Sequence, residues 1–270
     1  MRPLLVVDGD SFAHRAYHAL PKQINRNAVV GFTNMVVRLW EMEEPRAVLV
    51  GWDTLEVPTY RHEAFAGYQA GREFDASLLE QLAMLPELCT ALRFAVGKAP
   101  GYEADDFLAA AVSHEEAAGG SAVVASGDRD AFQLVSERTT VLQPVRGVSE
   151  ITRIGPAEVR ERYGVEPSQV PDFIALRGDP SDKLPGAKGV GPKTAAELLR
   201  QYGSLDAMLD EGRFSAQADE LRLYRRIAAM DATAPLPEIP DAIPDWAGGA
   251  ELVRSWGLDQ LADRLAGRNP

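Results

Sequence analysis

The stretch Leu4-Leu5-Val6-Val7-Asp8 (residues 4–8) predicts the fold of the amino-terminal half of this chain. Four apolar residues in a row are typical of a strand that is buried on both faces, as the strands of parallel sheets are. Comparable apolar runs stand shortly before Asp53 and Asp128. In an open parallel sheet, the carboxyl ends of the strands border the crevice where ligands bind. We therefore expect these three aspartates to meet at one edge of a sheet.

Strand-like and helix-like segments alternate through the first half of the chain. This alternation predicts an α/β fold of three layers with a mostly parallel central sheet. The expected strands are 3–8, 46–52, 121–126 and 138–142, and the expected helices are 28–43, 75–93, 104–117 and 130–135.

The second half of the chain has the pattern of a helical domain, and no strand is expected after Ile151. Pro156 and Gly164 delimit one of its helices, with proline in the first turn and glycine at the end. The stretch 231–249 is rich in proline, alanine and aspartate, so it should run extended. The other expected helices are 168–176, 193–202 and 257–266, the last of which should pack back on the first domain. The predicted domains are 1–150 (α/β), 151–230 (helical) and 231–270 (connector and last helix).

Composition limits the class of protein. A hydrophobic content of 46% and a charged content of 25% are typical of a globular protein, and no apolar stretch approaches the roughly 20 residues of a membrane helix. The first residues lead directly into a strand, so they do not resemble a signal peptide. The single cysteine, Cys89, excludes an internal disulfide and a cysteine-based zinc site. These features favour a cytoplasmic protein that has no membrane partner. A monomer is the expectation, because no pattern typical of an oligomer interface is evident.

The net charge of −12 at first argues against a nucleic-acid partner. Nine of the 40 acidic side chains, however, stand in a few short clusters, and the remainder nearly balance the 28 basic ones. Lys183, Lys188, Lys193 and Arg200 form a local basic stretch in which Glu197 is the only acid. A nucleic-acid interface therefore remains compatible with the charge distribution.

The nine clustered acids nearly all stand where an apolar run ends. A single aspartate at such a place is often a helix cap, but the joint pattern predicts carboxylates that converge and repel unless cations lie among them. Oxygen ligands select Mg²⁺ or Mn²⁺, and two such ions about 4 Å apart can hydrolyse a phosphodiester. We therefore predict a site for two or more divalent ions. The clusters are Asp8; Asp53; Glu103, Asp105 and Asp106; Asp128 and Asp130; and Asp179 and Asp182.

Residues 183–195 form a glycine-rich turn that leads into a helix. Gly189 and Gly191 would let backbone amides approach a phosphate, and Lys193 would add positive potential. A nucleotide-binding P-loop is excluded, because Pro192 stands where that motif needs lysine and no strand precedes the turn. A plain turn between two helices remains the alternative.

The chain resembles the 5′ nuclease (flap endonuclease) superfamily, and within it the 5′–3′ exonuclease domain of the bacterial DNA polymerase I type, as a free-standing member. The resemblance implies a PIN-like domain followed by a helix–hairpin–helix (H3TH) domain. The matching stretches occur in family order over nearly the whole chain: 7–15, 60–72, 100–106, 126–135 and 178–195.

The resemblance also implies an activity and its partners. The expected reaction is metal-dependent hydrolysis of DNA at a 5′ flap, a nick or a 5′ end, during replication and repair. It would include removal of RNA primers from RNA–DNA hybrids and coupling to a DNA polymerase. Mg²⁺ or Mn²⁺ would occupy the acidic site, and K⁺ would bind at the hairpin.

The roles of single residues follow from the same resemblance. The first metal would be held by Asp8, Asp53, Asp105 and Asp106, and the second by Asp128, Asp130 and Asp182, with Glu103 and Asp179 in support. The catalytic set would be Asp8, Asp53, Arg61, Arg72, Asp105 and Asp128. The DNA-binding set would be Arg15, Tyr68, Gln69, Lys188, Gly189, Gly191, Lys193 and Thr194.

Two departures keep other functions open. Gln69 stands where the family commonly has lysine, and the segment after Arg72, which forms an arch in the family, is short. A flap- or junction-binding protein with little or no catalysis is therefore the main alternative. A PIN-type ribonuclease that acts on single-stranded RNA is weaker, because such small domains lack the 178–195 hairpin.

Overall fold

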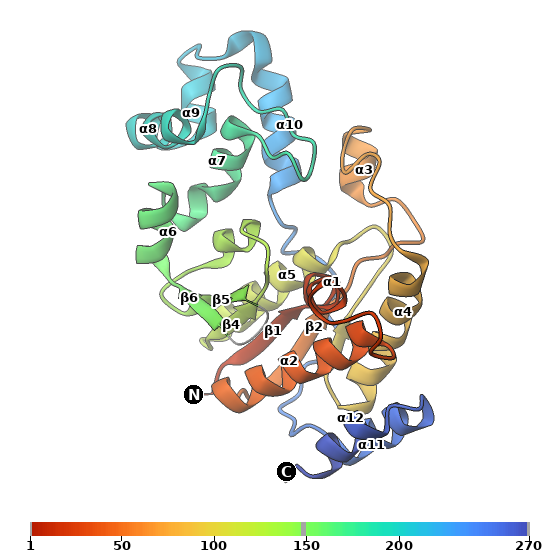
Figure 1. Ribbon diagram of the computed structural model, residues 1–270. Coiled ribbons are helices and arrows are strands. Elements are labelled where there is room, and N and C mark those ends of the chain that lie inside the picture. Colours follow the sequence, from red (N-terminus) through yellow and green to blue (C-terminus); the bar gives the residue numbers. More distant parts are fainter. Residues whose placement is uncertain (1, 147–149, 269–270) are drawn as a thin grey trace.

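The computed structural model describes residues 2–146 and 150–268. Figure 1 shows a sheet flanked by helices in the lower part of the molecule and a group of helices above it. The polypeptide is therefore an α/β half joined to a helical half, as the sequence predicts.

Over the described residues, the sheet has six strands in the order β3-β2-β1-β4-β5-β6, with the first strand of the chain near its centre. All neighbouring strands run parallel except β6, which is antiparallel to β5. The strands are β1 (Leu4–Asp8), β2 (Ala47–Gly51), β3 (Ala95–Gly97), β4 (Ala122–Ala125), β5 (Thr139–Arg146) and β6 (Glu150–Ile154).

Helices cover both faces of this sheet because alternate side chains of each strand point to opposite faces. In β1, Leu4 and Val6 pack toward Phe107 of α5, whereas Leu5 and Val7 belong to the core formed with α1, α2 and α4. These buried runs create two apolar layers, one on each side of the sheet. The helical elements of this half are α1 (Gly9–Ala19), α2 (Asn27–Glu43), α3 (Tyr60–Ala64), α4 (Ala76–Ala91), α5 (Ala104–Ala117) and the 3₁₀ helix η1 (Asp130–Leu134).

The helical half continues the apolar layer that lies on the α5 side of the sheet. Phe173 and Leu199 from this half share one buried cluster with Val124 of β4. Its elements are α6 (Pro156–Tyr163), η2 (Pro167–Gln169), α7 (Val170–Arg177), α8 (Pro192–Tyr202), α9 (Leu205–Asp210), η3 (Ser215–Gln217) and α10 (Ala218–Ala228).

The carboxyl-terminal helices, α11 (Trp246–Ser255) and α12 (Asp259–Ala266), lie against the lower face of the α/β half (Figure 1). Trp246 meets Trp40 of α2 edge to face at 5.3 Å, and Leu261 packs in the same cluster as Leu85 of α4. An extended connector without helix or strand leads from α10 to α11.

Most predicted elements are confirmed, with boundaries that differ by a few residues. The expectation of no strand after Ile151 is wrong, because β6 continues to Ile154 and pairs with β5. Several elements were not predicted: the strands β3 and β6 and the helices α1, α3, α9, α10 and α11. The elements β3, α3 and α9 have six residues or fewer, too few to show an apolar period, whereas α1, α10 and α11 each bury one apolar face that could have been recognised. The expectation that 231–249 runs extended is wrong at its end, because α11 begins at Trp246. The domain limits at 150 and 230 stay a prediction. In the described part of the chain, no helix is both long enough and apolar enough to cross a membrane.

Candidate active site

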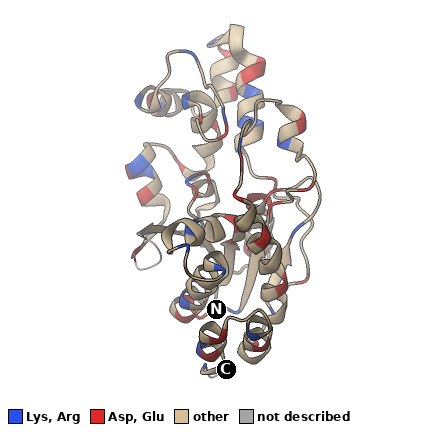
Figure 2. Cartoon of the chain, turned by 45° about the vertical axis from the view of Figure 1, so that its right-hand side comes forward, with Lys and Arg blue, Asp and Glu red and all other residues tan. Residues whose placement is uncertain are grey.

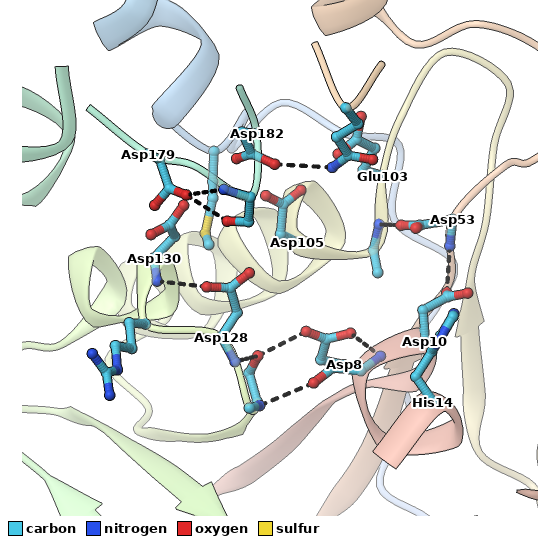
Figure 3. A pocket seen from close by; sticks show the side chains of 18 of the residues that line it. Asp8, Asp10, His14, Asp53, Glu103, Asp105, Asp128, Asp130, Asp179 and Asp182 are labelled. Carbon is cyan, nitrogen blue, oxygen red and sulfur yellow. Dashed lines mark hydrogen bonds between the residues drawn. The ribbon is translucent and has the colours of Figure 1, made fainter. Parts of the chain in front are cut away.

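A cleft of about 610 Å³ opens at the carboxyl ends of β1, β2 and β4, where the sheet faces the helical half. Acidic residues, red on the ribbon, are found in this region of the chain (Figure 2), and in the close-up the carboxylates surround one space (Figure 3). Acids from segments far apart in the sequence therefore meet at one edge of the sheet, as predicted. Those that line the cleft are Asp8, Asp10, Asp53, Glu103, Asp105, Asp128, Asp130, Asp179 and Asp182.

Asp8 ends β1 and caps helix α1. Its Oδ1 accepts a hydrogen bond from the amide of Ser11 at 3.0 Å, and its Oδ2 accepts one from the hydroxyl of Ser126 at 2.7 Å. Burial raises the pKa of Asp8 to about 7, although both of these hydrogen bonds lower it. The carboxylate is thus held in place but poorly solvated.

Asp10 and Asp53 form a second pair at the ends of β1 and β2. Asp10 Oδ2 accepts from the amide of Asp53 at 2.7 Å, and Asp53 Oδ1 accepts from the amide of Ala104 at 2.8 Å. Burial raises the pKa of both carboxyls, and Glu103 raises that of Asp53 further. Ala104 begins α5, so this helix presents its amino terminus to Asp53.

Glu103 is fixed from two sides by hydroxyl groups. Its Oε1 accepts from Thr59 at 2.7 Å and its Oε2 accepts from Tyr68 at 2.8 Å. Tyr68 was expected to bind DNA, but its side chain is only 4% exposed. Because its hydroxyl is engaged with Glu103, Tyr68 supports the acidic cleft and is not free to stack on a base.

The acids after β4 and α7 line the side of the cleft nearer the helical half. Asp128 follows β4, and its Oδ1 accepts from the amide of Asp130 at 3.1 Å. Asp179 and Leu184 exchange backbone hydrogen bonds of 2.9 and 2.8 Å, which brings Asp179 and Asp182 onto one tight turn. Burial raises the pKa of Asp130 and raises that of Asp182 to about 6.

Asp106 does not line the cleft, contrary to its predicted role as a ligand of the first metal. Its side chain is fully buried, and both of its carboxylate oxygens bind Arg61, at 2.8 and 3.1 Å. The reason is helical geometry, since Asp105 and Asp106 are adjacent on α5 and point to different sides. Asp105 faces the cleft, whereas Asp106 faces α10.

Arg61 is also not placed as predicted. Its side chain is 1% exposed and pairs with Glu103 at 3.2 Å, Asp105 at 3.1 Å and Asp106 at 2.8 Å. A guanidinium so enclosed cannot approach a substrate phosphate. Arg61 instead neutralises the acids at the start of α5, and these neighbours raise the pKa of Arg61 even though burial lowers it.

Arg72 and Gln69 remain at the cleft. The side-chain nitrogen of Gln69, Nε2, donates to Asp182 Oδ1 at 3.1 Å and to the hydroxyl of Tyr68 at 2.9 Å. The side-chain oxygen, Oε1, accepts a hydrogen bond from the exposed Arg72 at 2.7 Å. Gln69 has a φ of 47°, a left-handed conformation that costs a residue with a Cβ some free energy. The neutral amide therefore links a carboxylate of the helical half to a cation of the α/β half.

The predicted DNA-binding residues of the 183–195 turn are at the surface, whereas Arg15 is half-buried on α1 and does not line the cleft. Gly189 has a φ of 77°, which explains the glycine at this position. All five residues of the turn that were predicted to bind DNA are exposed: Lys188, Gly189, Gly191, Lys193 and Thr194.

The sequence analysis missed several residues that line the cleft, among them Asp10, Ser126 and Arg177. Asp10 could have been predicted, because Asp8 and Asp10 are two residues apart at the end of a strand, as Asp128 and Asp130 are. Ser126 gives no such signal, and neither does Arg177, which pairs with Asp179 at 3.2 Å. Their roles follow from the packing of distant segments.

The donor set fits hard divalent cations, because nine carboxylates line the cleft and Mg²⁺ and Mn²⁺ prefer oxygen ligands. The Oδ1 atom of Asp105 is buried and accepts no hydrogen bond from the described residues, which leaves it available to a ligand. Within the described ranges, however, no three His, Cys, Asp or Glu side chains are close enough to hold an ion as they stand. Binding would therefore require side-chain movement of the acids that already line the cleft.

Comparison with known proteins agrees with this geometry. Residues 3–164 match the family described as 5′-3′ exonuclease, N-terminal resolvase-like domain. This chain belongs to the 5′-3′ exonuclease family. Residues 165–245 match the C-terminal SAM fold of the same family, in the part of the chain that is helical here. The family resemblance and the fold class predicted from the sequence are therefore confirmed.

Relatives of this chain include longer proteins. The DNA polymerase I of Mycobacterium leprae is 45% identical over 215 residues, which are 77% of this chain and 24% of that protein. The chain thus spans about a quarter of the length of this curated relative.

Solved structures show the same fold at low identity. A T5 5′-exonuclease with divalent zinc ions bound is 19% identical, with a TM-score of 0.73 and coverage of 98% of both chains. Flap endonuclease-1 from Methanococcus jannaschii is 16% identical, with a TM-score of 0.61 and coverage of 98% of this chain and 91% of that chain. At these identities the likeness establishes the fold alone.

Proposed function

We propose that this chain is a metal-dependent 5′–3′ exonuclease and flap endonuclease that hydrolyses DNA phosphodiesters. The observation that carries the proposal is the cleft in which nine carboxylates, from both halves of the molecule, surround one space. Membership of a family of 5′-3′ exonucleases assigns this site its class of reaction. The zinc ions in the T5 structure support divalent ions as the cofactor.

Two groups of acids would hold the cations. The group on the β1–β2 side consists of Asp8, Asp10, Asp53, Glu103 and Asp105. The group on the helical side consists of Asp128, Asp130, Asp179 and Asp182. Two Mg²⁺ or Mn²⁺ ions would activate water and stabilise the leaving oxygen of the phosphodiester. The protein itself positions these carboxylates and, through Arg72, presents one exposed cation to the scissile phosphate.

The 183–195 turn is the proposed contact for the DNA duplex. Its exposed lysines and its glycines would bind backbone phosphates without reading the bases. We extend the proposal to substrates with a 5′ flap, a nick or a 5′ end, and to RNA primers in RNA–DNA hybrids. Binding of K⁺ at the turn, a monomeric state, a cytoplasmic location and coupling to a DNA polymerase belong to the same proposal.

A second candidate function is binding of flap or junction DNA with little or no catalysis. Gln69 favours it, because this neutral side chain occupies the position between Asp182 and Arg72 where a cation would face the phosphate directly.

One experiment separates the two functions. The folded protein is incubated with a duplex that carries a labelled 5′ flap, in Mg²⁺ or Mn²⁺, and products are resolved on a sequencing gel. Cleavage that disappears in Asp128→Asn supports the nuclease, whereas tight binding without cleavage supports the binding protein. A parallel reaction with single-stranded RNA identifies a ribonuclease of the PIN type.

A further inference from the structure

The carboxyl-terminal end of α10 is held by side chains of the α/β half. Each of five consecutive residues, Ile227–Asp231, offers one backbone atom to such a side chain. We call this arrangement the α10 clamp. Three side chains donate to backbone oxygens: Arg61 Nε to Ile227 (2.9 Å), Gln133 Nε2 to Ala228 (3.0 Å) and the Tyr60 hydroxyl to Ala229 (3.3 Å). Two side chains accept from backbone amides: Gln133 Oε1 from Met230 (3.0 Å) and Asp106 Oδ1 from Asp231 (2.8 Å).

The side chains of the clamp also contact both groups of acids in the cleft. Gln133 lies on η1, and its Nε2 donates to the backbone oxygen of Asp130 at 3.0 Å as well as to Ala228. Arg61 pairs with Glu103 and Asp105 on the other side of the cleft. The end of α10 is thus attached to two of the chain segments that carry acids of the α/β half, the start of α5 and the segment after β4.

The other end of α10 reaches the proposed duplex contact. Gln217 directly precedes α10, and its Oε1 accepts a hydrogen bond from the amide of Lys188 at 3.0 Å. Helix α10 packs along α7, which leads into Asp179. An eleven-residue helix is about 16 Å long, so α10 is a rigid spacer between the 183–195 turn and the acidic cleft.

We propose that the α10 clamp sets the distance between the bound duplex and the carboxylates, and thereby selects the phosphodiester that is cut, with Gln133 as its main positioning residue. The proposal rests on the proposed nuclease function. Gln133 does not line the cleft, so it would act only through the backbone atoms that it joins.

Gln133→Ala removes both links of this residue to the end of α10, together with its hydrogen bond to the backbone oxygen of Asp130, and substitutes none of the acids. Gln169→Ala is the matched control. Gln169 also donates to a backbone oxygen at a helix end, that of Gly203 (2.7 Å), and accepts from a backbone amide, that of Glu166 (2.9 Å). Both of these hydrogen bonds lie within the helical half. The two variants lose similar hydrogen bonds and differ in whether the two halves are joined.

The readout is product length at single-nucleotide resolution on a 5′-flap duplex with a fixed junction, together with affinity for the same duplex. We expect one dominant product for wild type and Gln169→Ala. For Gln133→Ala we expect cutting at two or more neighbouring positions, with affinity within about twofold of wild type. Tyr60→Phe removes the hydrogen bond from the Tyr60 hydroxyl to Ala229, and it should also produce cutting at two or more neighbouring positions. This variant replaces Gln133→Ala in the test if Gln133→Ala does not fold.

An unchanged product pattern in folded Gln133→Ala or Tyr60→Phe overturns the clamp proposal, even if the rate falls. Equal scatter in Gln169→Ala also overturns it, because general loss of stability would then explain the effect. If wild type cuts none of the substrates, the proposed function itself fails, and this outcome is distinct from uniform cutting by all variants.

Discussion

The hydroxyl of Ser126, which follows β4, lies 2.7 Å from Oδ2 of Asp8 at the end of β1, although the two residues are 118 positions apart. The same hydroxyl oxygen accepts a hydrogen bond from the amide of Asp128 at 3.0 Å. A single serine thus fixes the relative position of two acids that follow neighbouring parallel strands. The arrangement of Asp8 and Asp128 in the cleft therefore depends on β1 and β4 being neighbours in the sheet.

Without divalent ions, the stability of the protein should fall as the pH rises from about 4 to about 7. Burial raises the pKa of Asp8 from 3.8 to about 7 and that of Asp182 to about 6. These carboxyls bind protons more tightly in the folded state, so their stabilising protonation is lost as the pH passes through the folded pKa. The change should be on the order of a few kcal/mol. Thermal melts in EDTA across this range test it; Asp8→Asn should flatten the curve, and a melting temperature that rises with pH contradicts the prediction.

Mg²⁺ or Mn²⁺ should raise the melting temperature at pH 7.5, because cations bind the folded cleft and relieve repulsion among its carboxylates. A concentration of about 100 times the dissociation constant stabilises by about 2.7 kcal/mol. Calorimetric melts with and without the chloride salts measure the shift, and NaCl at matched ionic strength is the control. Combining Asp8→Asn with Asp128→Asn should abolish most of it; an equal shift in that variant would place the ions elsewhere.

Asp182→Ala should lower the rate of flap cleavage by orders of magnitude while the protein stays folded. The carboxylate of Asp182 lines the cleft, and the neutral side chain of Gln69 donates a hydrogen bond to it, so its negative charge remains available to a cation. Gln69→Ala should cost less, about 10- to 100-fold, because it removes a supporting contact and not a ligand. Single-turnover kinetics and melting curves distinguish the effects. A loss of thermal stability that accounts for the lost activity would make Asp182 structural.

Arg61→Met should destabilise the fold by about 3–5 kcal/mol, because it leaves Glu103, Asp105 and Asp106 without their buried cation. Arg254→Met is the matched control, since it breaks an exposed pair with Asp263 and should cost no more than about 1 kcal/mol. Urea denaturation of both variants measures the difference. Equal effects would show that the Arg61 network contributes little to stability.

Gly186→Ala should destabilise the protein more than Gly189→Ala. Both glycines have a φ of 77°, so each substitution brings strain of about 1 kcal/mol or more. At Gly186 an added Cβ would also lie 2.4 Å from the backbone nitrogen of Gly178, whereas at Gly189 it meets no atom within 4 Å. Thermal melts of the two variants test the order. Similar losses would mean that the turn shifts without cost.

A large part of the fold follows from short-range pattern. Uninterrupted apolar runs identify β1, β2 and β4, and the same runs place Asp8, Asp53 and Asp128 at strand ends. Short elements escaped this reasoning: β3 has three residues, and only Ile151 and Ile154 of the five residues of β6 are apolar, so neither shows an apolar period. Their places come from pairing with neighbouring strands.

The sequence by itself determined that acids follow buried parallel strands, because burial and strand direction are local properties of apolar runs. Only the tertiary structure decided which acids share the cleft. Helix α5 turns Asp105 into it and Asp106 away from it, and the packing of α10 encloses Arg61 among carboxylates. The direction of a side chain within a turn of helix, and the segment that it meets, depend on contacts between distant residues, which no local pattern records.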